Sequence, residues 1–117
     1  MRAHGNRLFA GRRYSVDVSG VLNNDTGNAC AYRVYWAAGA TVTTSGTVAL
    51  EVPCCTTQGF GQAVRGRNEL CTANSNAFTA GQVTLALYAV YVTGAGNSHW
   101  GDGATKPSIL SVTDIGV

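Results

Sequence analysis

Charged side chains are scarce in this sequence. They make up 12% of its 117 residues, about half of the roughly 25% that is usual in globular proteins. The net charge is only +2, and the arginines nowhere form a run of about five like charges, so the sequence does not indicate a nucleic-acid partner. No apolar stretch reaches the roughly 18 residues of a membrane-spanning segment, so no membrane span is expected.

Residues that commonly perform catalysis are also few. The only histidines are His4 and His99, and no pattern around either indicates a nucleophile with its base. The carboxylates are spread one by one, whereas glycoside hydrolysis needs two facing carboxylates and a divalent metal needs several clustered oxygens. They are Asp17, Asp25, Glu51, Glu69, Asp102 and Asp114. We therefore expect no enzyme activity, no cofactor and no metal, with a hydrolase that uses His99 as the alternative.

The four cysteines do not form a zinc motif. Cys54 and Cys55 are adjacent rather than separated by two residues, and the nearest histidine, His99, lies far downstream. Several disulfide pairings are open to four cysteines, and the sequence does not choose among them. Two states therefore remain, disulfides in a protein that acts outside a cell or buried reduced thiols, for Cys30, Cys54, Cys55 and Cys71.

Proline is rare as well, with two copies, whereas glycine occurs 15 times and small or β-branched residues make up most of the remainder. This composition is typical of β-strands joined by turns. A chain of 117 residues fits one domain, which buries about two-thirds of the surface that its unfolded chain exposes. The sequence contains no amphipathic helix of useful length and no internal repeat.

Alternation of apolar and polar residues predicts the strands. They are expected at 14–18, 29–37, 47–52, 82–93 and 108–115, with shorter strands near 60–64 and 70–72. Pro53 is expected to end the strand before it, because proline removes a ladder hydrogen bond. The predicted fold is all-β, a single antiparallel β-sandwich of about six to eight strands over residues 1–117, jelly-roll-like, with residues 1–8 as an extended or mobile arm.

The segment 82–93 has the strongest strand signal. Its two alternating sets of residues are both largely apolar. Such a strand is either central in a sheet and covered on both sides, or covered once and buried in an oligomer interface. A helix is the rival interpretation, but the β-branched and aromatic content and the glycines that follow favour a strand. The candidate interface residues are Tyr88, Val90 and Val92.

A polar loop with one tryptophan is the candidate ligand site. Trp100 either packs under its own loop or contacts a partner, because an exposed indole is costly to hydrate. A sugar ring could stack on the indole while neighbouring amide and carboxylate groups bind its hydroxyls. The candidate ligand-binding residues are Asn97, His99, Trp100 and Asp102.

Several segments, taken in order, resemble a known family. They are Ala10-Gly11-Arg12-Arg13-Tyr14, Tyr32-Arg33-Val34-Tyr35-Trp36, Thr44-Ser45-Gly46-Thr47-Val48, Phe78-Thr79-Ala80, Val83-Thr84-Leu85-Ala86-Leu87, Tyr91-Val92-Thr93-Gly94-Ala95-Gly96 and Ile109-Leu110-Ser111-Val112-Thr113-Asp114-Ile115-Gly116. From about residue 7 onward the chain resembles the β-sandwich domains of virion proteins of tailed bacteriophages of actinobacteria, which occur in minor tail proteins and related surface components. The segment from Cys54 through Asn74 matches nothing in that family.

The resemblance implies a structural protein without catalytic residues. We expect a non-enzymatic virion component, either a minor tail protein or a capsid decoration protein, that acts through protein–protein assembly with other virion proteins. A homo-oligomer, a trimer or a higher cyclic form, is expected, and so is assembly of the virion in the host cytoplasm, in keeping with first residues that lack the apolar core of a signal peptide. The alternative is a carbohydrate- or receptor-binding module that attaches the particle to a host surface glycan.

Overall fold

The computed structural model of the chain describes residues 2–24, 29–55, 62–71, 78, 80–93, 98–100 and 108–117. These residues form β-strands and the turns between them, and no helix occurs among them. The strands are β1 (Arg2–Leu8), β2 (Arg13–Asn24), β3 (Ala29–Ala38), β4 (Thr47–Cys55), β5 (Gln62–Cys71), β6 (Gly81–Thr93), β7 (Ser98–Trp100) and β8 (Ile109–Gly116).

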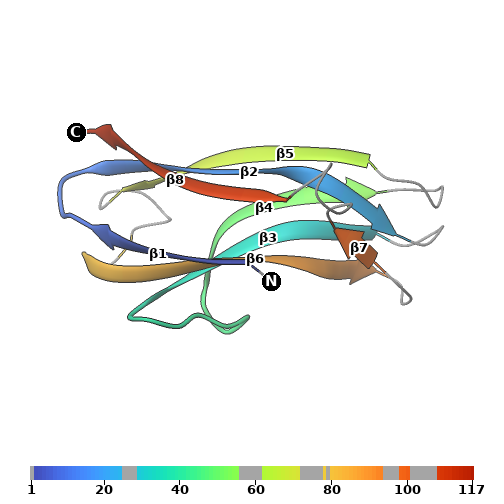
Figure 1. Cartoon of the computed structure of the whole chain (residues 1–117), viewed down its shortest axis with the longest axis horizontal. Coiled ribbons are helices and arrows are strands. Elements are labelled where there is room, and N and C mark those ends of the chain that lie inside the picture. The colour runs from blue at the N-terminus through green and yellow to red at the C-terminus, as the bar shows by residue number, and fades with distance from the viewer. Residues whose placement is uncertain are drawn as a thin grey trace.

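The strands lie in two antiparallel sheets that face each other (Figure 1). Sheet A has the order β1-β6-β3-β4. In sheet B, β2 pairs with β5 along one side and with β7 and β8 along the other. Apart from the β3–β4 hairpin and the step from β7 to β8, successive strands lie in opposite sheets, as in jelly-roll and other Greek-key sandwiches. The predicted all-β antiparallel sandwich is therefore confirmed.

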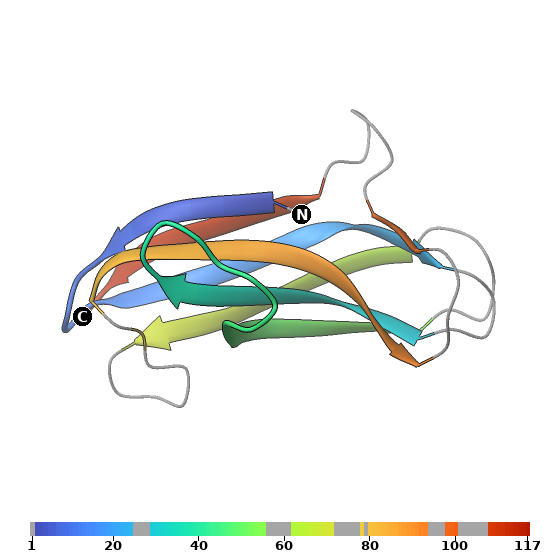
Figure 2. The same ribbon diagram turned by 90° about the horizontal axis from the view of Figure 1, so that it is seen from below.

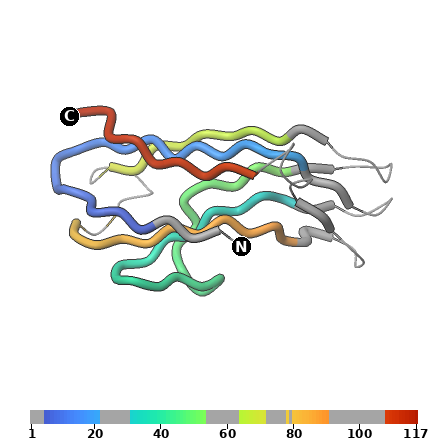
Figure 3. Tube along the Cα trace, viewed as in Figure 1, coloured from blue at the N-terminus to red at the C-terminus, as the bar shows by residue number. Residues whose placement is uncertain are grey.

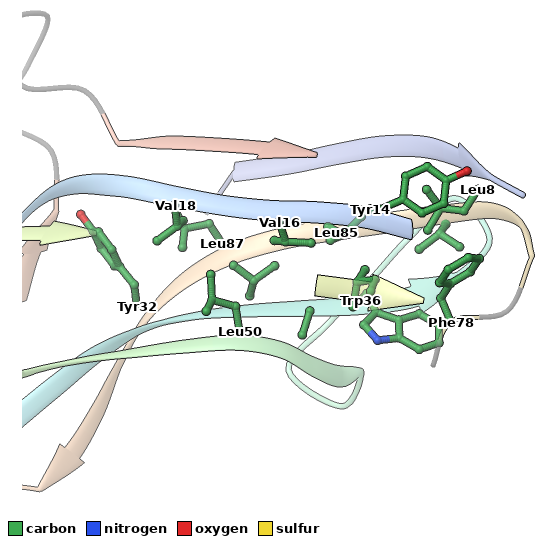
Figure 4. Close-up of a cluster of buried hydrophobic side chains, with 14 of the residues drawn as sticks. Leu8, Tyr14, Val16, Val18, Tyr32, Trp36, Leu50, Phe78, Leu85 and Leu87 are labelled. Carbon is green, nitrogen blue, oxygen red and sulfur yellow. The ribbon is translucent and has the colours of Figure 1, made fainter. Parts of the chain in front are cut away.

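The hydrophobic core lies between the two sheets (Figure 4). Two sets of side chains that the alternation predicts to share a face are buried in it, and their members are Tyr14, Val16 and Val18 of β2 and Tyr32, Val34 and Trp36 of β3. Leu85 and Leu87 of β6 lie among them and are fully buried. Burial of one such side chain stabilises the fold by about 1.5–3 kcal/mol, so the inner faces of the sheets hold the sandwich together.

The first residues belong to the sandwich. The sequence predicts an extended or mobile arm for residues 1–8, and residues 2–8 are extended and paired with β6 along the whole of β1. Figure 3 shows the chain running from Gly5 through Leu8 and on into β2. Leu8 is 2% exposed and belongs to the core. The edge of sheet A is thus completed by a segment with little apolar signal of its own.

The strand β4 continues through Pro53, so the prediction that this proline ends the strand is wrong. Pro53 lies opposite Ala31 of β3 and the pairing extends to Cys55. β4 forms the outer edge of sheet A, and an edge strand tolerates proline because part of its N–H groups face no neighbouring strand.

The strand β5 replaces the two short strands expected in its region. Residues 62–71 form one strand that pairs with β2 throughout. Val64 and Leu70 point into the core, but the inward positions between them belong to Gly66 and Asn68. The apolar alternation is therefore interrupted in the sequence although the strand is continuous.

Both interruptions have a packing reason. A Cβ atom at Gly66 would lie 2.1 Å from Cγ2 of Val52, so only glycine allows β5 to approach β4 this closely. The side chain of Asn68 donates a hydrogen bond of 2.8 Å to the carbonyl oxygen of Ala49. These contacts join the two sheets along the edge formed by β4 and β5.

Candidate functional site

The strand β6 is central in sheet A, between β1 and β3. Its inward side chains, such as Leu85 and Leu87, are in the core. On its outer side, Thr84 and Ala86 are also buried, with exposed fractions of 5% and 0%. Part of the outer face of sheet A is therefore covered, as the apolar character of both sides of this strand led us to expect.

The cover comes from the chain itself. Figure 2 shows the segment between β3 and β4 crossing the outer side of β6. The hydroxyl of Thr84 donates to the carbonyl oxygen of Gly39 at 2.8 Å, and the N–H of Gly39 donates to the carbonyl oxygen of Gln82 at 2.8 Å. These bonds fix the start of the segment to β6.

An apolar surface remains beyond this cover, and we call it the sheet A patch, made of Val48, Tyr88 and Val90 around Tyr35, which is itself only 6% exposed. The rings of Tyr35 and Tyr88 meet edge to face with their centroids 5.5 Å apart. Val48 lies opposite Tyr35 in the ladder and is 39% exposed, and Tyr88 and Val90 are half-buried. The patch offers packed aromatic and aliphatic surface to a partner.

One ion pair lies at the sheet A patch. Arg33 forms a salt bridge with Glu51, and its Nη1 donates to the hydroxyl of Tyr35 at 3.0 Å. The guanidinium carbon lies 5.9 Å from the centroid of the Tyr35 ring. The hydrogen bonds to Tyr35 and Glu51 raise the pKa of Arg33. The charge is therefore held in place by its neighbours, and the tyrosine rings are fixed with it.

Two of the three predicted interface residues belong to this patch. Tyr88 and Val90 lie on the outer face of β6, opposite Arg33 and Ala31 of β3. The main chain of Val92 continues β6, but its side chain lies outside the described residues. Their role in an interface stays a prediction.

The predicted ligand site lies mostly outside the part of the chain that the structure describes. Asn97 and Asp102 are not among the described residues. The main chain of His99 and Trp100 is in β7, a short strand paired with β2, rather than in a loop as the sequence suggests. Their side chains lie outside the described residues, so carbohydrate binding at these positions stays a prediction.

The outer face of sheet B is polar and carries paired charges. Arg13 binds Glu69 through two hydrogen bonds of 2.7 and 2.8 Å. Arg12 binds Asp114 in the same bidentate way, with a shortest contact of 2.8 Å. Each arginine, through its side-chain hydrogen bonds, lowers the pKa of its carboxyl partner. These carboxylates are held ionised at the surface.

A second polar cluster joins β2 to β5. Nε of Arg67 donates to the hydroxyl oxygen of Ser15 at 2.7 Å, and that hydroxyl donates to Oδ2 of Asp17 at 2.6 Å. Oδ1 of Asp17 lies 3.7 Å from Nε of Arg67. Ser15 is only 2% exposed. The cluster therefore fixes Arg67 and Asp17 side by side on the outer face.

Beside this cluster the face is hollowed by an open groove of about 530 Å³. We call it the sheet B groove, and its lining residues are Asp17, Val18, Ser19, Arg65, Gly66, Arg67, Ile109 and Ser111. They come from three adjacent strands, β5, β2 and β8. Sequence analysis did not identify this site because it depends on the pairing of β5 with β2, and the strand signal of β5 is interrupted.

The cysteines are only partly described. Cys71 is a half-buried free thiol at the end of β5. The main chains of Cys30 and Cys54 lie directly opposite each other in the β3–β4 ladder. Within the described ranges no group of three or more His, Cys, Asp or Glu residues is placed to hold a metal. The choice between disulfides and thiols at the other positions stays open.

The chain was compared with protein families, with curated proteins and with solved structures. No family model, no curated protein and no solved structure matches it. Among the residues described, no helix is long and apolar enough to cross a membrane.

Proposed function

We propose that this chain is a non-enzymatic structural protein of a bacteriophage virion, a minor tail or capsid decoration component that works by packing against other subunits. The observation that carries the proposal is the sheet A patch, where the central strand of the sheet presents Tyr88 and Val90 on its outer side. An outer sheet face with aromatic and aliphatic side chains suits burial between subunits.

The composition of the patch resembles the centre of a protein interface. Aromatic residues and arginine are enriched at such centres, and here Tyr35 contacts both Tyr88 and Arg33. Because Arg33 already has Glu51 as its partner, a subunit that covers the patch would not bury an unpaired charge. The side chains are fixed before binding, so little conformational freedom is lost when a partner covers them.

The charged groups support a role without catalysis. The described carboxylates of Asp17, Glu51, Glu69 and Asp114 each lie within salt-bridge distance of an arginine. The pKa values of Glu69 and Asp114 are lowered by those partners, which is the opposite of what a general acid at neutral pH requires. The assignment to a virion rests on the sequence segments that, taken in order, resemble virion proteins. The sheet A patch supplies the surface for assembly.

Incorporation into particles tests the proposal. Phage particles are grown with the chain supplied as the wild type, as Val90→Lys or as Thr113→Lys, and the chain in purified particles is quantified by mass spectrometry. Thr113 is the matched control because it is an exposed strand residue on the other sheet, opposite Ser15.

We expect wild type and Thr113→Lys in the particles, and Val90→Lys reduced by at least about tenfold, because a charge at the contact must be desolvated. Absence of the wild-type chain from particles would refute the virion assignment. Equal incorporation of all three chains would refute the patch as the contact.

A further inference from the structure

The sheet B groove has a defined shape because of the order of side chains across three strands. Two successive outward rows cross it: Arg67, Asp17 and Ser111 face one another in the first, and Arg65, Ser19 and Ile109 in the second. The long arginines stand on β5, whereas the small serines lie lower on β2 and β8. The main chain of Gly66 lines the groove, while its side-chain position faces inward toward Val52. Long side chains therefore border the hollow, and short side chains line its centre.

The polar groups of the groove have bonding capacity that the described residues do not use. Arg65 is exposed and has no hydrogen-bond or ion-pair partner among the described residues, in contrast to Arg13 of the neighbouring strand. Arg67 is held through its Nε by Ser15, and no described residue accepts from its two Nη groups. As far as the described residues go, two guanidinium ends can therefore bind an anionic group, and a planar carboxylate matches their geometry.

The groove also needs hydrogen-bond donors from its ligand. Oδ2 of Asp17 is engaged by Ser15, but Oδ1 lies 3.7 Å from Nε of Arg67, too far for a good hydrogen bond. The hydroxyls of Ser19 and Ser111 have no partner within the described part of the chain and can both donate and accept. A ligand that only accepts hydrogen bonds, such as sulfate, would offer no donor to Asp17 and be repelled by its charge.

An apolar wall completes the site. Ile109 is 47% exposed at the margin of the groove, beside Ser19 in the ladder. A sugar ring carries C–H groups on its faces and hydroxyls around its rim, so it can contact the isoleucine while its hydroxyls reach the serines and the aspartate. The volume of about 530 Å³ falls within the usual range for small-ligand sites.

From these features we infer that the sheet B groove binds an acidic saccharide, with the sugar carboxylate on Arg65 and Arg67, hydroxyls on Asp17, Ser19 and Ser111, and the ring against Ile109. The groove lies on the opposite sheet from the sheet A patch. Saccharide binding and assembly are therefore separate properties of this chain.

Titration of the ¹⁵N-labelled chain, followed by NMR, tests the inference. The probe is trigalacturonate, and the comparison ligands are the neutral trisaccharide maltotriose, inorganic phosphate and a triglutamate peptide. We expect saturable shifts confined to residues near 17–19, 65–67 and 109–111 with trigalacturonate, and at least about tenfold weaker binding of the other three, because each lacks either the carboxylate or the hydroxyls. Equal binding of triglutamate or phosphate would overturn the inference, and so would the absence of saturable shifts with trigalacturonate.

Three variants locate the site. Arg65→Gln should weaken trigalacturonate binding by about tenfold, whereas Arg7→Gln, an equal charge change at an exposed arginine of β1 in the other sheet, should leave it unchanged. Asp17→Asn should weaken binding because Asp17 accepts from a sugar hydroxyl. Stronger binding by Asp17→Asn would reveal a simple anion site and overturn the assignment, as would equal losses in Arg65→Gln and Arg7→Gln. Thermal unfolding of each variant verifies that the fold is retained.

Discussion

The hydroxyl oxygens of Tyr32 and Ser108 lie 2.8 Å apart inside the sandwich, and they connect the two sheets. Tyr32 is fully buried on β3, and its hydroxyl donates to the carbonyl oxygen of Val21 on β2 at 2.9 Å. Because a tyrosine hydroxyl has one proton, Ser108 must be the donor in the shared bond. Gly20 makes room for the pair, since a Cβ there would lie 2.9 Å from both hydroxyl oxygens.

Removal of this hydroxyl should destabilise the fold. Tyr32→Phe leaves the carbonyl of Val21 and the hydroxyl of Ser108 without their buried partner, so we expect the free energy of unfolding to fall by about 1–3 kcal/mol. Urea unfolding measures the change. Tyr88→Phe, at a half-buried tyrosine on the outer face, is the control and should change stability by less than about 0.5 kcal/mol. Similar losses of unfolding free energy in both variants would show that the buried hydrogen bonds of Tyr32 do not stabilise the fold.

The close approach of β4 and β5 gives a second prediction. Gly66→Ala forces a Cβ against Cγ2 of Val52 and should lower the free energy of unfolding by about 1–3 kcal/mol. In the background of Val52→Ala the same change should have a much smaller effect, which a double-mutant cycle detects. Gly5→Ala on β1 is the control, because nothing lies within 4 Å of its Cβ position. Additive effects of Gly66→Ala and Val52→Ala would contradict the predicted contact.

The surface ion pairs give a prediction about pH. The pKa values of Glu69 and Asp114 are lowered from their ordinary 4.5 and 3.8 by hydrogen bonds from Arg13 and Arg12. A lowered pKa in the folded state means that these pairs stabilise the fold fully above the ordinary values, and that the stabilisation is lost as the pH falls through the lowered ones. The urea midpoint should therefore be constant from neutral pH down to about pH 5 and then decrease.

Variants of the two carboxyl residues check the origin of this decrease. Glu69→Gln and Asp114→Asn should each show a shallower decline on acidification than the wild type, and high salt should diminish the difference because both pairs are exposed. The three proteins would decline in parallel if the ion pairs had no part in the pH dependence.

The strands with a regular apolar alternation could be predicted from the sequence, and the physical reason is clear in β2, β3 and β6. Within 14–18, 32–36 and 83–87 their inward positions hold large apolar side chains without interruption, as Val16 and Val34 illustrate. β2 extends beyond the predicted 14–18 to Asn24, past the inward Gly20. β5 could not be predicted as one strand because Gly66 and Asn68 occupy inward positions for reasons of packing and hydrogen bonding across the edge. β1 has little apolar character of its own beyond Leu8 and depends on the neighbouring β6.

The two outer surfaces also differ in how far they could be predicted from the sequence. The sheet A patch could be anticipated from the second apolar set of residues in 82–93, although the segment that covers Thr84 and Ala86 could not, because its path depends on hydrogen bonds with Gly39. The sheet B groove required the register of three strands. Arg65 and Ile109 are far apart in the sequence and share a row only through Ser19.

Light scattering of the purified chain during size-exclusion chromatography tests the central claim, that the outer face of sheet A is a contact between subunits. The account predicts a discrete oligomer for the wild type and for Thr113→Lys, and a folded monomer for Val90→Lys, because a charge at Val90 opposes burial of the sheet A patch. A wild-type chain that stays monomeric at high concentration, or a Val90→Lys variant with the same mass as the wild-type oligomer, would contradict it.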